Sequence, residues 1–422
     1  MSSKLIVPTQ DRAQAAQRPL RLLTFSTLFP SAERPNHGVF VENRLRHLVA
    51  TRPVESTVMA PVPYFPFKAA RFRTWSQHAR TSRLEARHGL VVHHPRYPLL
   101  PKLGMATAPL MLYQASLRAL RRLMADGLQF DVIDAHYLYP DGVAAVWLGR
   151  QLGRPVVVTA RGSDVTQIAQ YLLPRHLIRA AVQEAAAVIT VSAALRQGVI
   201  ELGAPAGQVH VLRNGVDLDV FHPVPRDAAR LALGMTRPTL LSVGHLIERK
   251  GHALTIQAMR LLPEWNLVIL GEGPDRPALE ALVGKSGLTS RVRLLGGRPH
   301  GDLPGYYGAA DAMVLASSRE GWANVLLEAM ACGTPVIASD IPGTREVMRS
   351  PEAGRLVART PEAIAAGVRA LFAALPNRDA TRAYAEQFGW EETSAGQYEL
   401  FRAVQAAEVT ARPETKQAVV AG

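Results

Sequence analysis

The sequence has a single cysteine, Cys332, among its 422 residues. One cysteine cannot form an internal disulfide or supply a cysteine-based zinc cluster, and it suits a reducing compartment. No apolar run approaches the roughly 20 residues that a membrane-spanning helix needs. The first 20 residues also lack the apolar stretch of a signal peptide. We therefore expect a cytoplasmic protein that does not cross a membrane.

Acidic residues are scarce relative to basic ones, and the formal net charge is +13. The segment 64–125 holds eleven Lys or Arg residues and one acid, Glu85, with Phe65, Phe67, Phe72 and Trp75 interleaved among them. This pattern suits either a solvated basic face or peripheral binding to an anionic membrane surface on its inner, cytoplasmic side. Nucleic acid is not an expected partner, because no nucleic-acid recognition motif accompanies the charge.

The length and the 48% hydrophobic content predict two or three globular domains with a large core. Short apolar, β-branched runs alternate with helical stretches in two series. The first series is 21–27, 54–60, 131–137, 155–160, 186–192 and 209–214, and the second is 238–244, 266–271, 292–296, 312–317 and 335–339. Such strands predict parallel sheets covered on both faces.

Two series of this kind predict an α/β protein with two doubly wound domains. We place the first domain at 20–215, completed by a C-terminal helix at 388–404, and the second at 216–387. Residues 1–19 and 405–422 are expected to be mobile ends. Ligands of doubly wound sheets bind at the carboxyl ends of the strands, so a site is expected in the cleft between the domains.

Two glutamates, Glu320 and Glu328, flank the start of a short apolar helix after the strand at 312–317. We expect this helix to run from Val325 to Cys332, with Asn324 as its N-cap and Gly333 just beyond its end. Because the helix is apolar all round, it is expected to be buried. Cys332 is interpreted as a packing residue.

A carboxylate on a buried helix is costly unless it is hydrogen-bonded, and a vicinal diol such as a ribose offers two donors to Glu328. The helix N-terminus offers backbone N–H groups that attract phosphates. These four N–H groups belong to Gly321, Trp322, Ala323 and Asn324. A diol acceptor beside a phosphate site indicates a nucleotide, and Glu320 would face the group beyond the phosphates. The alternative is that both acids simply stabilise the helix dipole.

The stretch E-G-x-x-N-x-x-x-E-A-M-A-C-G-T-P-V resembles the carboxylate motif of retaining nucleotide-sugar glycosyltransferases of family 4, which have the GT-B fold of two Rossmann-like domains. The resemblance extends from about residue 20 to about residue 404. Further segments resemble the family in order and spacing: 191–223, 241–258, 269–283 and 292–317.

The resemblance implies a role for each matching residue. Glu328 would hold the donor ribose, and Glu320 would lie beside the transferred sugar. Lys250, with Arg249 and His245, would contact the diphosphate, where negative charge builds on the leaving group. The remaining donor contacts that it implies are Gly38 for the diphosphate and Glu272, Leu295 and Gly296 for the base.

The chain departs from the family pattern at three places. His245 stands where an arginine is usual, Arg161 precedes Gly162 where a histidine is common, and the first strand is followed by only one glycine, Gly38. We consider Arg161, Asp164 and His37 as sugar or acceptor contacts, and His136 as either a catalytic or a structural residue. The other histidines of interest have the character of surface or loop residues: His93, His94, His252 and His300.

No metal and no cofactor are expected. Asp217 and Asp219 form an Asp-x-Asp pattern, but they lie in a linker away from the expected donor site. The resulting hypothesis is transfer of a sugar from a UDP- or GDP-linked donor to a glycan or lipid-linked glycan, with retention, in polysaccharide or cell-envelope synthesis. The alternatives are a phosphorylase or epimerase on the same fold, and a catalytically silent sugar-binding protein.

Overall fold

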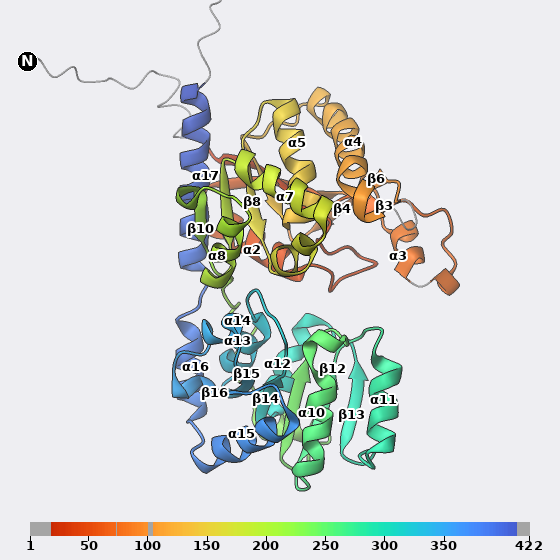
Figure 1. Ribbon diagram of the computed structural model, residues 1–422, viewed down its shortest axis with the longest axis vertical. Helices are drawn as coiled ribbons and strands as arrows, with labels where there is room; N and C mark the ends of the chain where they lie inside the picture. The colour runs from red at the N-terminus through yellow and green to blue at the C-terminus, as the bar shows by residue number, and fades with distance from the viewer. Residues whose placement is uncertain (1–17, 73, 100–103, 412–422) are drawn as a thin grey trace, which may run out of the picture.

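The computed structural model describes residues 18–72, 74–99 and 104–411, and these form two α/β domains, one above the other in Figure 1. Most of the two expected mobile ends, residues 1–17 and 412–422, lies outside the described residues. Each domain contains one large sheet, and the second sheet is parallel throughout. The predicted fold class is confirmed.

The first sheet has eight strands, and each pair of neighbours is parallel except β4 and β5. In spatial order the strands are β10 (Val209–Val211), β9 (Ala187–Thr190), β8 (Val156–Ala160), β7 (Val132–His136), β1 (Leu20–Phe25), β2 (Val54–Met59), β5 (Leu90–His93) and β4 (Leu84–Arg87). Every strand predicted in the first series is present. The β4–β5 hairpin was not predicted, because its strands are short; its turn residues, His88 and Gly89, both have positive φ.

Helices cover both faces of the first sheet. They are α2 (Val39–Thr51), α4 (Gly104–Ala125), α5 (Val143–Leu152), α6 (Ser163–Thr166), α7 (Leu172–Glu184), α8 (Ala193–Glu201) and α17 (Glu391–Ala411). Helix α3 (Thr74–Arg80) lies outside the sheet layers. Two short strands, β3 (Val62–Pro63) and β6 (Arg96–Tyr97), form a separate small sheet. Side chains such as Leu23 and Ile133 pack with those of α4, α5 and α7. Their neighbours Leu22 and Val132 point the other way, into the core formed with α2 and α17.

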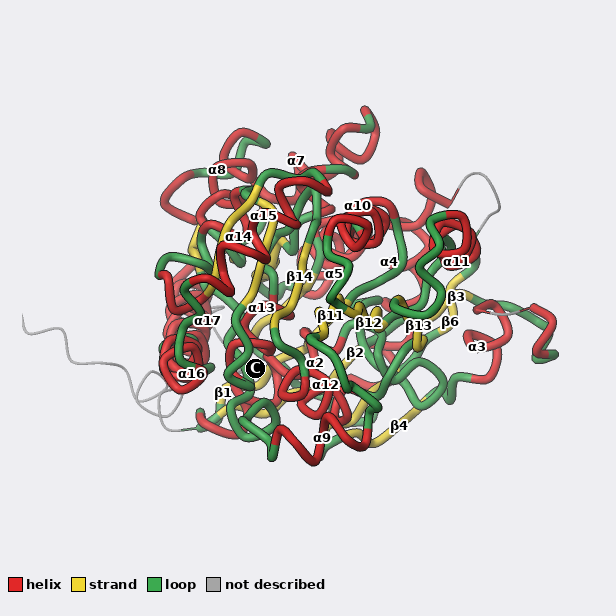
Figure 2. Tube along the Cα trace, turned by 90° about the horizontal axis from the view of Figure 1, so that it is seen from below, coloured by secondary structure: helices red, strands yellow, loops and turns green. Residues whose placement is uncertain are grey.

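The second sheet has the strand order β13 (Val292–Gly296), β12 (Asn266–Leu270), β11 (Thr239–Val243), β14 (Ala312–Leu315), β15 (Val336–Ser339) and β16 (Gly354–Val357). Its helices are α9 (Arg226–Ala232), α10 (His252–Ala258), α11 (Arg276–Lys285), α12 (Leu303–Ala309), α13 (Asn324–Ala331), α14 (Pro342–Arg345), α15 (Pro361–Ala373) and α16 (Arg378–Glu386). Viewed from below in Figure 2, these helices surround the strands. One core joins the sheet to α10, α11 and α15, and another joins it to α12, α13 and α16.

The chain passes between the domains twice, and the two passages lie side by side. The N–H of Val216 donates to the carbonyl of Phe388 at 2.9 Å, and Gly215 packs so closely on Gly389 that a Cβ would lie 2.7 Å from its carbonyl carbon. Helix α17 then returns along the first domain and packs on α2 (Figure 1). It ends at Ala411, so residues 405–411, expected to be mobile, are helical.

Candidate functional site

A cavity of about 450 Å³ lies between the two domains, at the carboxyl ends of the strands. The first domain contributes the segment 36–43, which contains Gly38 and the start of α2. The second domain contributes the ends of β11 and β12, the segment 297–303 and one face of α13. The cleft site that the fold class predicted is therefore present.

Glu328 lies on α13 and faces this cavity, with only 13% of its side chain exposed. Its Oε2 accepts a hydrogen bond from the hydroxyl of the fully buried Tyr307 at 2.9 Å. Its Oε1 lies 3.7 Å from Nε2 of His300. Although burial lowers the pKa of His300, the bond to Glu328 raises it above the ordinary value overall. The carboxylate therefore retains acceptor capacity toward the cavity while two neighbours hold its position.

The start of α13 differs from the prediction by one residue. Ala323 is the N-cap and Asn324 is the first helical residue, so the predicted side-chain cap is wrong. Instead, Oδ1 of Asn324 accepts from Nδ2 of Asn214, in the segment that links the domains, at 3.3 Å. The other end matches the prediction: Gly333 has φ of 74°, and its N–H donates to the carbonyl of Met330 at 2.8 Å.

Lys250 lies beside the cavity, against Gly244, which lines it. Its side chain passes over Gly244, and its Nζ donates to Oε1 of Glu320 at 2.7 Å. Glu320 is 8% exposed and also accepts from the hydroxyl of Ser317 at 2.6 Å, while Arg249 lies 3.7 Å away. The two residues expected to act on different parts of the donor are thus paired with each other.

The domains touch directly next to this pair. A Cβ on Gly321 would lie 2.2 Å from the carbonyl oxygen of Arg161, so only glycine fits there. Trp322 and Ala323, which follow Gly321, are buried. The loop before α2 is equally tight: Gly38 has φ of 76°, and a Cβ there would lie 2.3 Å from the carbonyl carbon of Leu28.

Arg161 belongs to a buried polar cluster that also contains His136. One guanidinium nitrogen lies 2.7 Å from Nδ1 of His136, and another donates to Oδ1 of Asn214 at 3.1 Å. The His136 ring is 1% exposed, and its Nε2 lies 3.2 Å from a carboxylate oxygen of Asp134. Of the two roles expected for His136, catalytic or structural, its burial and contacts favour the structural one: the ring lies behind Arg161 and positions the guanidinium.

Arg44, on α2, completes the cluster and donates to the same Asn214 oxygen at 3.1 Å. Burial, followed by repulsion from Arg161, lowers the pKa of Arg44 to about 9. Burial lowers the pKa of Arg161 to about 10. Because two guanidinium groups converge on one amide, this cluster ties α2, β7 and the linker between the domains together.

Two further candidates lie away from the interdomain cavity. Asp164 is fully buried and accepts from the backbone N–H groups of Leu138, Arg161 and Gly162, so it holds the turn after β8 and does not face a ligand. His37 lines a second cavity in the first domain, on the other side of the loop that contains Gly38.

The residues expected near the base line the cavity only in part. Glu272 lines the cavity as expected, but Gly297 and Arg298 line it in place of Leu295 and Gly296. Oε1 of Glu272 accepts from the N–H of Gly297 at 3.2 Å.

Sequence reasoning also missed His300 and Tyr307, because their contacts with Glu328 join separate segments of the chain. A surface or loop position was expected for His94 and His252: His94 does lie in a loop but is buried, and His252 is buried on α10.

The Asp-x-Asp pattern in the linker makes backbone contacts. Oδ1 of Asp217 accepts from the N–H groups of Asp219 and Val220, and Oδ2 lies 3.4 Å from His47. Among the described residues, no group of three or more His, Cys, Asp or Glu side chains could hold a metal ion. Within 18–72, 74–99 and 104–411, every helix is too short or too polar to cross a bilayer.

Comparison with known proteins shows which family the chain belongs to. Residues 37–220 match the model of Glycosyltransferase Family 4, and residues 224–388 match that of Glycosyl transferases group 1. A D-inositol 3-phosphate glycosyltransferase of Thermobispora bispora is 30% identical over 351 residues, covering 75% of this chain and 81% of the relative.

Solved structures share the fold. Sucrose-phosphate synthase of Thermosynechococcus elongatus is 23% identical, with a TM-score of 0.75 over 92% of this chain and all of that chain. HepE of Anabaena, solved in complex with UDP-glucose, is 20% identical, with a TM-score of 0.67 over 91% of this chain and 99% of that chain. The chain therefore belongs to the family 4, group 1 glycosyltransferases, and it is a glycosyltransferase with the GT-B fold.

Proposed function

We propose that this glycosyltransferase takes its sugar from a nucleoside diphosphate donor bound in the interdomain cavity and transfers it, with retention, to a hydroxyl of a glycan or lipid-linked glycan. The observation that carries the proposal is the placement of Glu328: a nearly buried carboxylate, oriented by Tyr307 and His300, that faces the cavity. A ribose diol would supply the donors that this carboxylate lacks.

The placement of the ribose at Glu328 determines where the base and the diphosphate of the donor would lie. The base would lie against Glu272, Gly297 and Arg298, and the diphosphate would lie at the N-terminus of α13, near His245. The HepE complex supports this reading, because that protein of the same fold was solved with UDP-glucose bound. UDP-linked sugars are therefore the first donors to test, with GDP-linked sugars as the alternative.

Lys250 would provide the cation that the leaving diphosphate requires. An ammonium group has three N–H donors, so Lys250 can keep its bond to Glu320 and still reach a phosphate oxygen. Glu320 would in turn hold the lysine and accept hydrogen bonds from the sugar. Arg249 and the N-terminus of α13 add positive charge. We propose that these groups make a metal ion unnecessary, so transfer should persist in EDTA.

In this mechanism the leaving phosphate helps to deprotonate the acceptor hydroxyl on the same face of the sugar, which retains the anomeric configuration. The glycosidic C–O bond of the donor breaks, the acceptor oxygen bonds to the same carbon, and the acceptor proton passes to the phosphate. Lys250 stabilises the charge that builds on the diphosphate.

The decisive experiment is a screen of UDP- and GDP-linked sugars with the full chain, in which release of free nucleoside diphosphate is followed with and without glycan acceptors. We expect release to increase with an acceptor and proton NMR of the product to show the donor's anomeric configuration. A phosphorylase would instead require inorganic phosphate, and a silent binding protein would release no nucleotide. Either result, or inversion of the product, would overturn the proposal.

A group of aromatic side chains on the first domain supports the proposal that the enzyme meets its acceptor at an anionic membrane surface. The ring centroid of Phe65 lies within 5.8 Å of the ring centroids of Phe67, Phe72 and Trp75. The segment that carries these rings, which includes α3, projects from the side of the first domain (Figure 1). Phe67 is 55% exposed, and the exposed Lys68 and Arg71 lie in the same projection. Apolar rings beside cations match a bilayer interface with anionic lipid.

Vesicle flotation tests this surface. The protein should float with vesicles that contain phosphatidylglycerol and remain behind with pure phosphatidylcholine, and Phe67→Ser should reduce flotation severalfold. Leu231→Ser is the matched control, because Leu231 is an 85% exposed apolar residue on α9 of the second domain. Equal flotation with both lipids, or equal losses in the two variants, would exclude the aromatic group as a membrane contact.

A further inference from the structure

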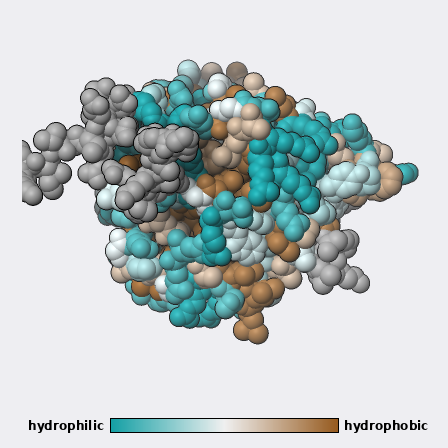
Figure 3. All heavy atoms as spheres, turned by 90° about the horizontal axis from the view of Figure 1, so that it is seen from above, coloured by the Kyte–Doolittle hydropathy of each residue, from teal (hydrophilic) through white to brown (hydrophobic). Residues whose placement is uncertain are grey.

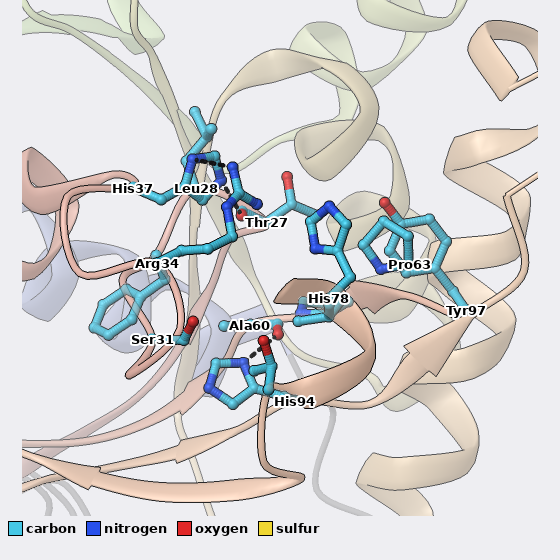
Figure 4. Close-up of a pocket in the computed structure, with 14 residues that line it drawn as sticks. Thr27, Leu28, Ser31, Arg34, His37, Ala60, Pro63, His78, His94 and Tyr97 are labelled. Carbon is cyan, nitrogen blue, oxygen red and sulfur yellow. Dashed lines mark hydrogen bonds between the residues drawn. The ribbon is translucent and has the colours of Figure 1, made fainter. Parts of the chain in front are cut away.

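A second cavity, of about 230 Å³, lies within the first domain (Figure 4). One wall is the segment from Thr27 to His37, which joins β1 to α2. The same segment continues into Gly38, which lines the interdomain cavity. The two cavities therefore lie on opposite sides of one loop. Figure 3, which views the first domain from above, shows mainly hydrophilic residues with scattered apolar ones over that end of the molecule. The cavity itself is lined by several ionisable groups, among them Arg34, His78 and His94.

Arg34 is the cation that lines this cavity. Among the described residues, its guanidinium has one hydrogen-bond partner, Nδ1 of His37, at 2.9 Å. The other nitrogen of His37 lies 3.1 Å from the carbonyl of Thr27, so Nε2 carries the proton and Nδ1 accepts from Arg34. Burial, followed by repulsion from Arg34, lowers the pKa of His37 to about 4, so this ring is neutral at pH 7. Arg34 is thus bonded to a neutral group.

The nearby carboxylates do not compensate Arg34. Glu33 pairs with Arg80 at 2.7 Å, and Oε2 of Glu85 accepts from the N–H of Ala32 at 3.0 Å. Asp141 accepts from both the N–H and the hydroxyl of Thr27, and burial raises its pKa to about 7. A carboxyl group with that pKa is substantially protonated at neutral pH and supplies little negative charge.

Two imidazole nitrogens in the wall have no hydrogen-bond partner among the residues that the structure describes. They are Nδ1 of His78 and Nε2 of His94, and both are buried. His94 contacts the carbonyl of Ala60 through Nδ1 at 2.9 Å, so its Nε2 is an acceptor, with a carboxylate oxygen of Glu85 3.9 Å away. Figure 4 shows Arg34, His78 and His94 arranged around the same space. Buried polar atoms without partners are costly, and a ligand that satisfies them would bind preferentially.

We infer that this cavity holds the oxyanion group, phosphate ester or carboxylate, of a hydroxylated acceptor, with Arg34 binding the anion and the unpartnered nitrogens of His78 and His94 bonding the acceptor's hydroxyl groups. An uncompensated guanidinium matches a phosphate or carboxylate, and the imidazole nitrogens match sugar hydroxyls. The identification of the ligand as the acceptor rests on the proposed function. The oxyanion site itself does not, and it is tested by binding alone.

The test is isothermal titration of the full chain saturated with UDP, which occupies the donor cavity so that added phosphate cannot bind there. The probes are inorganic phosphate, glucose 6-phosphate, glucuronate and neutral glucose. We expect saturable binding of at least one oxyanion, at least tenfold tighter than glucose. The phosphate and carboxylate arms then identify which oxyanion the site prefers. If UDP itself does not bind, the proposed function fails separately, and the titrations are repeated with Lys250→Ala.

Substitutions assign the binding to the cavity. Arg34→Gln should weaken the preferred oxyanion at least tenfold, and Arg34→Lys should retain part of the affinity. Arg175→Gln, at an exposed arginine on α7, is the matched control and should change it less than twofold. His78→Ala provides a second variant if thermal melting shows that Arg34→Gln is unfolded; because His78 bonds the hydroxyl groups, this variant is titrated with glucose 6-phosphate and glucuronate and should weaken the tighter of the two severalfold. Unchanged affinity in folded Arg34→Gln or His78→Ala, equal binding of glucose, or no saturable oxyanion binding would overturn the inference.

Discussion

Removal of the Glu328 carboxylate is the most direct test of the donor site. If the carboxylate accepts two hydrogen bonds from the ribose, each bond to this charged group contributes about 1.5–3 kcal/mol. Loss of even one such bond raises the Kd for UDP by roughly tenfold to a hundredfold, since about 1.4 kcal/mol corresponds to a factor of ten. Glu328→Ala should therefore weaken UDP binding by at least tenfold.

The substitution also affects the protein itself, because the buried hydroxyl of Tyr307 donates to Glu328. An unpartnered buried hydroxyl costs about 1–3 kcal/mol of stability. The double variant Glu328→Ala/Tyr307→Phe removes both groups and avoids that cost. Its melting temperature should be higher than that of Glu328→Ala, and its UDP affinity should be equally poor.

A thermodynamic cycle isolates the ribose contact. Isothermal titration should show that wild-type protein binds 2′-deoxy-UDP at least tenfold more weakly than UDP. In the double variant the two ligands should bind within about twofold of each other, because the acceptor of the 2′-hydroxyl is gone. If the wild type does not distinguish the ligands, or if the double variant distinguishes them equally well, Glu328 does not bind the ribose and the reasoning is wrong.

Three further predictions concern charge, backbone and pH. Lys250→Ala should lower kcat by about a hundredfold or more while changing the Kd for UDP less, because Lys250 acts where charge develops in the transition state. Gly38→Ala should lower the free energy of unfolding by roughly 2 kcal/mol, since φ is 76° and the new Cβ would overlap backbone; Gly207→Ala, in open space, should be neutral. The pKa of Asp141 is raised to about 7 from 3.8, so its native form keeps a proton that the unfolded form releases. Wild-type stability should therefore fall between pH 4 and pH 7, by at most roughly 4 kcal/mol relative to Asp141→Asn.

Each of these predictions has a contradicting result. Steady-state kinetics with unchanged kcat in Lys250→Ala would remove that lysine from the leaving-group site. Equal urea midpoints for the Gly38 and Gly207 variants would show that the loop accommodates a side chain. Parallel stability profiles of wild type and Asp141→Asn, measured by urea unfolding at pH 5 and pH 8, would show that Asp141 is ionised in the native state.

The architecture could be predicted from the sequence because it depends on local patterns. Continuous apolar strands between helices require sheets covered on both faces, and the strands at 132–136 and 312–315 lie where the pattern placed them. Gly333 was predictable for the same reason, since a left-handed residue after a short apolar helix is a local requirement. The hairpin of β4 and β5 escaped prediction because its strands are short and partly exposed, so they carry a weak periodic signal.

The site was only partly predictable. The carboxylate motif pointed to Glu328, which lines the interdomain cavity, and the segment 241–258 pointed to Lys250, which packs beside Gly244 of that cavity; their roles toward a donor stay predictions. It could not show that Lys250 pairs with Glu320 or that Tyr307 orients Glu328, because these pairs join residues that are far apart in the chain.

His136 and His37 illustrate the same limit. His136 is the last residue of β7 and His37 lies in the loop after β1, but His136 is buried behind Arg161 and His37 faces a separate cavity. The sequence alone determined the two-domain fold and the acidic and basic residues at its cleft, because hydrophobic period and motif spacing are properties of a segment. Only the tertiary structure decided which of those side chains share a cavity, because burial and pairing depend on how distant segments pack.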